Sequence, residues 1–213
     1  MTVTIKKYLV EFIGTFFLVL SVCMAGTKAG DFAPIAIGST LMVMVYAGGY
    51  ISGGYYNPAI SLAAFIRGRI PVITLIAHWI VQLLAAIVAA YVAKNLFLYQ
   101  AHLFMPDFPK RAIIAEGLGT FALAYVVLNV ATSAKTAGNS NYGLAIGFTV
   151  TAMAYVLGPF SGGAFNTAVA LGACVFGAFA WSNLWIYIIG TIGGGLVAGL
   201  VYKWMNPDAM GTL

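Results

Sequence analysis

Charged side chains are scarce in this sequence. Asp, Glu, Lys and Arg make up 7% of its 213 residues, whereas 62% of the residues are hydrophobic. A soluble globular domain carries about 25% charged residues, so the few charges here would leave most of a water-exposed surface apolar. We therefore expect the chain to fold within a lipid bilayer.

The sequence also lacks the marks of a disulfide framework, a metal site or an enzyme. Its two cysteines, Cys23 and Cys174, fall in apolar segments and are expected to be buried thiols. We find no nucleophile–base pair, no phosphate-binding loop and no metal-ligand spacing, so we expect no enzymatic activity, no cofactor and no metal. The first apolar segment has no recognisable cleavage site and contains Glu11, which favours a retained helix over a signal peptide.

The basic residues are scattered, which argues against nucleic acid as a partner. Ten Lys and Arg against five Asp and Glu give a net charge of +5. Such loop charges set the orientation of membrane proteins. With the N-terminus inside, six basic residues face the cytoplasm and four face outward, so we expect both termini in the cytoplasm. The six are Lys6, Lys7, Arg67, Arg69, Lys135 and Lys203, and the four are Lys28, Lys94, Lys110 and Arg111. With no organelle signal, the plasma membrane is the expected location.

Long apolar segments are abundant. Six of them approach the roughly 20 residues that a helix needs to cross a bilayer. They cover residues 8–26, 34–51, 71–93, 112–132, 142–159 and 183–204. Two shorter apolar segments, 58–67 and 167–177, each follow a glycine-rich turn. We expect these two to be half-helices that enter the membrane without crossing it.

The sequence repeats itself. The pattern Glu-x-x-Gly-Thr-Phe at residues 11–16 returns at 116–121, and Ser-Gly-Gly-x-x-Asn at 52–57 returns at 161–166. Each half contains three full spans, an odd number, so the second half must lie upside down relative to the first. Interrupted segments at matching positions of inverted repeats point to the functional site.

These features predict an all-α membrane protein with six transmembrane helices and two re-entrant half-helices in two inverted repeats. We expect one channel domain over residues 1–213, with repeats at about 1–100 and 106–213. The loop at 94–111 is the expected junction.

Two short motifs open the half-helices: Asn57-Pro58-Ala59 and Asn166-Thr167-Ala168. In lipid, non-helical backbone is tolerated only where it is buried in protein or lines a water-filled cavity. Two such turns that meet at mid-membrane therefore predict a polar path. Each Asn can cap its half-helix and direct its amide group into the path, and Pro suits the first helical position.

The turns before the motifs are rich in glycine. We expect glycines 53, 54, 162 and 163 to let the chain run extended, so that carbonyl oxygens form a ladder of acceptors along the path. The expected ladder residues are Gly53, Gly54, Tyr55, Gly162 and Ala164.

On these residues the chain resembles the aquaporin, or major intrinsic protein, family. The first motif matches the family's Asn-Pro-Ala in full, whereas Thr167 replaces the proline of the second. The resemblance covers essentially the whole chain, including Gln82 in the third span. It implies that Glu11 and Glu116 bind loop N–H groups inside the bundle, and that the protein is a homotetramer in the lipid bilayer with one pore per subunit.

The resemblance also implies a selectivity filter near the outer mouth, at Ile37, Ala154, Gly163 and Val169. Family members selective for water or glycerol carry aromatic residues and an arginine at these positions. Here Val169 takes the place of the arginine, and none of the four side chains can donate a hydrogen bond. We therefore expect a wider and more apolar outer neck.

The predicted function is a passive channel for water and small neutral solutes such as glycerol, urea, ammonia or hydrogen peroxide. Three alternatives stay open. A nearby aromatic side chain could narrow the path to water alone, the inverted repeats could belong to a secondary transporter, or the fold could be a closed structural membrane protein. The nearby aromatic residues are Tyr55, Tyr56, Tyr155, Phe160 and Phe165.

Overall fold

The computed structural model describes residues 3–207, and most of these residues are helical. Six helices are long and apolar enough to cross a membrane. They are α1 (Val3–Lys28), α2 (Ala33–Ser52), α4 (Val72–Tyr91), α5 (Pro109–Thr132), α6 (Tyr142–Ser161) and α8 (Leu184–Met205). Two short helices, α3 (Pro58–Ile66) and α7 (Thr167–Phe176), lie between them in the chain.

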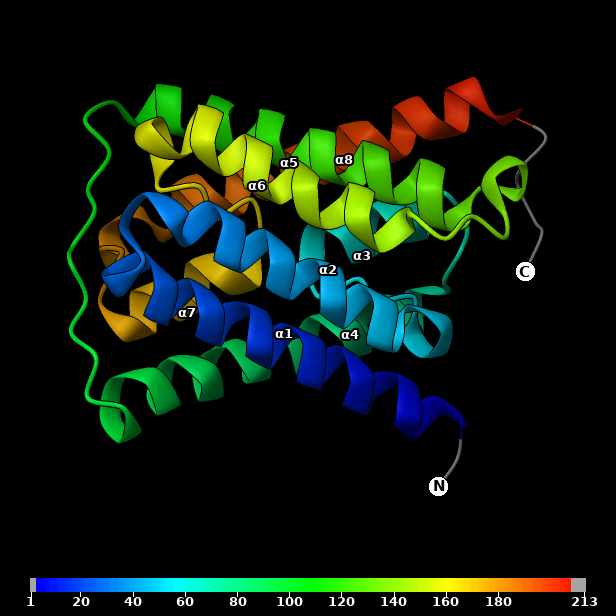
Figure 1. Cartoon of the computed structure of the whole chain (residues 1–213). Helices are drawn as coiled ribbons and strands as arrows, with labels where there is room; N and C mark the ends of the chain where they lie inside the picture. The colour runs from blue at the N-terminus through cyan, green and yellow to red at the C-terminus, as the bar shows by residue number, and fades with distance from the viewer. Residues whose placement is uncertain (1–2, 208–213) are drawn as a thin grey trace.

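The long helices run side by side as a bundle (Figure 1). Helix α1 begins and α8 ends at the same end of the bundle, which we call the terminal end. The segment 97–108 runs along the opposite end, which we call the loop end (Figure 1). The two halves of the chain correspond element by element, because α5 to α8 repeat the order of α1 to α4.

Each short helix packs against the last helix of the other half. Helix α3 contacts α8, and α7 contacts α4, while α1 contacts α2 and α5 contacts α6. The two halves are therefore interlocked through their short helices. The predicted fold, with six spanning helices and two half-helices in inverted repeats, is confirmed.

Proline and glycine mark the ends of the helices. Pro58 and Pro109 stand in the first turn of α3 and α5, where the missing N–H costs no hydrogen bond. Gly53 and Gly162 end α2 and α6 in the left-handed conformation, and the N–H of each donates to the carbonyl oxygen four residues earlier. Glycine therefore ends the helix before each re-entrant turn, and proline begins the half-helix after the first one.

Close backbone approach holds the helices together at glycines. Gly194 on α8 packs against the carbonyl oxygen of Gly117 on α5, where a Cβ would collide with backbone atoms. By contrast, a Cβ on Gly193 would meet nothing within 4 Å. Small residues at helix contacts are typical of packing in lipid, where van der Waals contact drives association.

Apolar side chains cover the outer faces of the bundle. Phe148, Ile114 and Ile80 are more than half exposed, at 58%, 61% and 54%. Such a surface is suited to lipid and unsuited to water. Polar side chains are also buried inside the bundle, among them Glu11, Asn57, Glu116 and Asn166 beside the two re-entrant turns.

Candidate functional site

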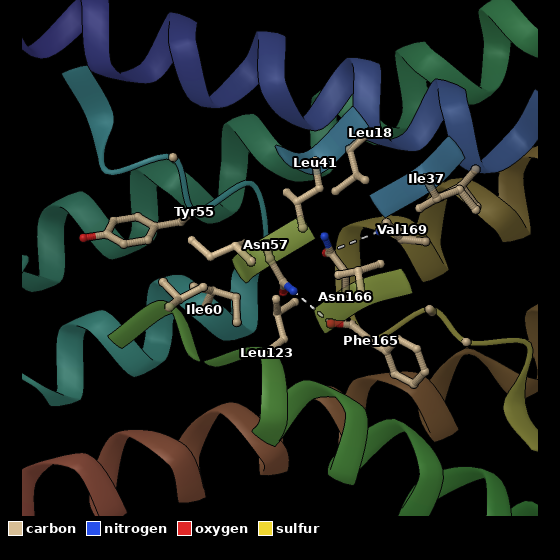
Figure 2. A pocket seen from close by; sticks show the side chains of 17 residues that line it. Leu18, Ile37, Leu41, Tyr55, Asn57, Ile60, Leu123, Phe165, Asn166 and Val169 are labelled. Atoms are coloured by element: carbon tan, nitrogen blue, oxygen red, sulfur yellow. Dashed lines mark hydrogen bonds between the residues drawn. The ribbon is translucent and has the colours of Figure 1, made fainter. Parts of the chain in front are cut away.

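Two asparagine side chains meet at the centre of the bundle. The Nδ2 atom of Asn57 donates a hydrogen bond to the carbonyl oxygen of Phe165 at 2.9 Å, and Nδ2 of Asn166 donates to that of Tyr56 at 2.9 Å. Each asparagine therefore binds the backbone just before the other. An amide group carries two hydrogens, so each Nδ2 keeps one for another acceptor. Both side chains line the same cavity (Figure 2).

The same asparagines cap the short helices. Oδ1 of Asn57 accepts from the N–H of Ala59 at 2.9 Å, and Oδ1 of Asn166 accepts from the N–H of Ala168 at 2.9 Å. Since α3 and α7 both begin at this point, the positive ends of both helix dipoles converge on it. This arrangement disfavours a cation or a hydrated proton between the two asparagines.

Glu11 binds the first turn. Its Oε1 accepts hydrogen bonds from the hydroxyl of Ser52 at 2.7 Å and the N–H of Tyr55 at 3.0 Å. Its Oε2 accepts from the N–H of Tyr56 at 2.8 Å and from Nε2 of Gln82 at 2.9 Å. All four partners are donors, which suits an ionised carboxylate. Glu11 is fully buried, so these bonds replace its hydration.

Glu116 binds the second turn in the same way. Its Oε1 accepts from the hydroxyl of Ser161 at 2.7 Å and the N–H of Ala164 at 3.0 Å, and its Oε2 from the N–H of Phe165 at 2.6 Å. Ser161 and Ser52 then each accept from the N–H two residues later, at 3.1 and 3.0 Å. The two buried carboxylates therefore hold both turns in equivalent shapes.

The backbone of the two turns is not extended, contrary to what we predicted from their glycines. Gly53, Gly54, Gly162 and Gly163 have φ angles of 102°, 63°, 87° and 69°, all in the left-handed region. Glycine adopts this region without the penalty that a Cβ brings. The glycines are needed because each helix must stop and reverse sharply before the next asparagine.

Two residues after each glycine pair, an aromatic residue also adopts the left-handed backbone conformation. Tyr56 has φ 50° and Phe165 has φ 48°, which is uncommon for bulky residues. Their rings pack against Gly14 on α1 and Gly119 on α5, where any Cβ would overlap the ring. This contact explains why Gly recurs in the Glu-x-x-Gly-Thr-Phe pattern. In each repeat, the glutamate of the pattern binds the turn, and its glycine leaves space for the aromatic ring of the same turn.

The turns carry free acceptors. No hydrogen bond between described residues ends on the carbonyl oxygens of Gly54, Tyr55, Gly163 or Ala164. All four residues line the central cavity. Buried carbonyl groups are nearly always paired, so these oxygens are suited to binding a molecule that occupies the cavity.

Three cavities follow one another along the bundle. The central cavity, around the two asparagines, has a volume of about 30 Å³. A cavity at the loop end measures about 320 Å³, and one at the terminal end about 870 Å³. One water needs roughly 10–15 Å³ measured in this way, so the central cavity has room for about two or three waters. Its remaining walls are mainly aliphatic, from Leu18, Val22, Leu41, Ile60, Leu123, Val127, Ile146 and Val150.

The four predicted filter positions lie where the loop-end cavity meets the central one. Ile37 and Gly163 line both cavities, whereas Ala154 lines only the loop-end cavity and Val169 only the central one. Figure 2 shows Ile37 and Val169 on the side of the asparagine pair opposite to Tyr55. Ala154 therefore belongs to the larger cavity and Val169 to the smaller one.

The structure adds residues that the sequence did not single out. Arg67 is buried at the end of α3, where Nε binds the hydroxyl of Thr132 at 2.8 Å and Nη2 binds its carbonyl oxygen at 2.7 Å. Its guanidinium also lies 5.5 Å from the ring centroid of Tyr202. The sequence placed Arg67 among the loop charges, and only its position directly after an apolar half-helix hinted at burial.

A further residue explains how the altered second motif is accommodated. The hydroxyl of Thr167 lies 2.7 Å from that of Thr191 on α8. In the first motif, the carbonyl oxygen of Pro58 accepts a hydrogen bond from Nε1 of Trp79 on α4 at 2.9 Å. Each short helix is thus fastened to the neighbouring long helix by a different polar contact.

Comparisons with known proteins identify the family. Residues 1–202 match the model of the major intrinsic protein family. The chain is 37% identical to glycerol uptake facilitator protein-like 6 of Lactiplantibacillus plantarum, over 95% of this chain and 99% of that protein. It is 32% identical to putative aquaporin NIP4-1 of Arabidopsis thaliana, over 93% of this chain and 74% of that protein.

A solved structure shares the fold. The aquaglyceroporin from Plasmodium falciparum superposes with a TM-score of 0.81, at 18% sequence identity, over 97% of this chain and 98% of that chain. The fold and the family indicate a channel in the membrane. The chain therefore belongs to the major intrinsic protein family, as a member whose second motif is Asn-Thr-Ala.

Proposed function

We propose that this protein is a passive channel for water and small neutral solutes, with a path that runs between Asn57 and Asn166. The observation that carries this proposal is the alignment of the central cavity with a larger cavity at each end. Unpaired carbonyl oxygens and one spare N–H on each asparagine give a molecule in the path its hydrogen bonds.

The proposed solutes are uncharged. Two helix dipoles direct their positive ends at the midpoint of the path, and no described carboxylate lines any of the three cavities. Relatives named as a glycerol facilitator-like protein and as an aquaporin support water and glycerol as the first solutes to test. Urea, ammonia and hydrogen peroxide complete the proposed set.

We propose an outer neck with weak chemical selectivity. Ile37, Ala154, Gly163 and Val169 offer neither a cation nor a side-chain donor, so this neck selects by fit alone. The same aliphatic walls give a rival outcome, because a narrow apolar passage can dewet and close. The central volume of about 30 Å³ is the observation that favours this rival.

The proposed assembly is a homotetramer in the plasma membrane, with the terminal end of the bundle in the cytoplasm. The exposed apolar faces of the helices suit contact with lipid or with further copies of the chain. Lys7 and Arg69 line the terminal cavity, which is consistent with basic residues on the cytoplasmic side.

Stopped-flow light scattering of proteoliposomes under an osmotic gradient tests this proposal. A passive channel gives water flux above that of empty liposomes, which rises linearly with the gradient and needs no ion gradient. Saturable flux that depends on an ion gradient would instead indicate a transporter, and flux equal to that of empty liposomes would indicate a closed fold. A conductance recording on the same protein checks that cations do not pass.

A further inference from the structure

The path has a second junction between cavities, at the end opposite to the predicted filter. Of the described residues, only Tyr55 lines both the central cavity and the large terminal cavity. Figure 2 shows its ring extended from the first turn, away from Asn57 and from the neck formed by Ile37 and Val169. Any molecule that moves between these two cavities therefore passes Tyr55.

The ring of Tyr55 is held in place from two sides. It packs over Gly53, where a Cβ would stand 2.7 Å from the Cζ atom of the ring. On the other side the ring lies 5.6 Å, centroid to centroid, from His78 on α4, whose ring in turn packs edge-on against Tyr8 at 6.0 Å. Tyr55 is 5% exposed, so little freedom remains for the ring.

The hydroxyl of Tyr55 is free to bind a solute. It makes no hydrogen bond to any described residue, and its oxygen is not sealed off from the surrounding space. The neighbouring carbonyl oxygens of Gly54 and Tyr55 likewise accept no bond from the described part of the chain. Tyr55 and the turn that carries it therefore offer one side-chain donor and two backbone acceptors along this stretch of the path.

We propose that Tyr55 forms an inner selectivity site, which binds small neutral solutes through its hydroxyl and limits their size with its ring. This inference rests on the proposed channel function and extends it. The outer neck provides no side-chain donor, so the inner site adds to the two asparagines a second place where a hydroxyl or amide group of a solute can be recognised. The solute class is neutral molecules with both donors and acceptors, such as short polyols and amides.

His78 acts through Tyr55 as a positioning residue. Its side chain is fully buried, and neither ring nitrogen has a hydrogen-bond partner among the described residues. Its contribution is therefore the packing of a flat ring against Tyr55. His78→Phe should keep the solute selectivity of the wild type, whereas His78→Ala should shift it in the direction of Tyr55→Ala.

The first test compares solute permeabilities in proteoliposomes. Tyr55→Ala should raise glycerol permeability several-fold relative to water and admit a five-carbon polyol that the wild type excludes. Tyr55→Phe keeps the ring and should lower glycerol permeability roughly two- to tenfold, the effect of one lost hydrogen bond on a barrier. Tyr50→Ala is the matched control, because Tyr50 lines the terminal cavity without reaching the central one. Unchanged selectivity in Tyr55→Ala, or an equal change in Tyr50→Ala, would overturn the proposal.

A second test reports on position 55 without relying on solute flux. In a chain with Cys23→Ala and Cys174→Ala, the variant Tyr55→Cys should react with a small negatively charged methanethiosulfonate reagent, because position 55 lines both cavities. The control Tyr50→Cys should react as well, because Tyr50 is 82% exposed. Val19→Cys should not react, because Val19 is fully buried and lines none of the three cavities. No reaction of Tyr55→Cys, or equal reaction of Val19→Cys, would contradict an accessible site at position 55. If no variant conducts water, the channel proposal fails, and the labelling still decides whether position 55 lines a space open to water.

Discussion

The hydroxyl groups of Thr167 and Thr191 form a hydrogen bond of 2.7 Å between α7 and α8. Thr167 stands where the first motif has Pro58, so this bond belongs to the second half of the chain alone. It fastens the start of the half-helix to the bundle, directly after Asn166.

Restoring proline at this position should destabilise the protein slightly. Thr167→Pro suits the first helical position, but it leaves the buried hydroxyl of Thr191 without this partner, at a cost of about 1–3 kcal/mol. Adding Thr191→Val should recover most of the loss. Thermal unfolding of the two single variants and the double variant in detergent measures this coupling, and additive effects would show that the two hydroxyls do not interact.

Removing either buried carboxylate should abolish water flux. In Glu116→Gln, the NH2 group replaces one of the two accepting oxygens, so it faces either the N–H of Phe165 or the N–H of Ala164 and the hydroxyl of Ser161. Each donor left unpaired costs about 1–3 kcal/mol, so the second turn should lose its shape. Glu11→Gln should act likewise on the first turn. Stopped-flow shrinkage in sucrose measures the effect.

Asp31→Asn is the control for these variants, because Asp31 is exposed at the loop end of the bundle. Its unfolding midpoint and flux should match those of the wild type. If Glu116→Gln conducts water as fast as Asp31→Asn, the hydrogen bonds of the carboxylate do not hold the turn.

Two adjacent glycines on α8 should respond oppositely to the same substitution. In Gly194→Ala, the added Cβ collides with the backbone of Gly117 on α5, and overpacking of this kind costs about 1–3 kcal/mol. In Gly193→Ala, the Cβ meets nothing within 4 Å, so the helix should gain about 0.5–1 kcal/mol. Thermal unfolding in detergent should give a lower midpoint for Gly194→Ala than for Gly193→Ala. Equal midpoints would refute the close approach of α5 and α8.

An arginine at the neck should suppress solute flux more than water flux. In Val169→Arg, the carbonyl oxygens of Gly163 and Ala164 are available to accept bonds from the guanidinium, and the side chain should fill the space beside Ile37. We expect glycerol permeability to fall about tenfold, which corresponds to a barrier higher by about 1.4 kcal/mol.

Val169→Leu adds bulk without charge or donors, so it separates the two causes. It should reduce glycerol and water flux in similar proportion. Equal glycerol-to-water ratios in Val169→Arg, Val169→Leu and the wild type would mean that position 169 does not contribute to selection.

The order of the helices could be predicted from the sequence, because a helix that spans a bilayer needs an apolar segment of a set length. Apolar runs of spanning length, two half-length runs and an internal repeat are sufficient to predict the helices and their inverted order. The predicted span 142–159 corresponds to α6 (Tyr142–Ser161), and the predicted half-helix 167–177 corresponds to α7 (Thr167–Phe176). Family resemblance then placed the motif residues.

Details of the site were less accessible, because they depend on contacts between distant parts of the chain. Arg67 is buried where it binds Thr132, and the ring of Tyr56 is held where it packs on Gly14. No nearby sequence pattern predicts either contact. The position of Tyr55 between two cavities likewise emerges only when the cavities are known. Backbone reversal at the four turn glycines replaced the extended conformation that their composition suggested.

Proteoliposomes of the purified protein, shrunk first in sucrose and then in glycerol, test the proposed channel and its apolar neck together. We predict shrinkage in sucrose faster than for empty liposomes, and shrinkage in glycerol followed by prompt re-swelling as glycerol enters through the apolar neck. Fast shrinkage without re-swelling would contradict the weakly selective neck and restrict the path to water. Shrinkage no faster than that of empty liposomes would contradict the channel itself.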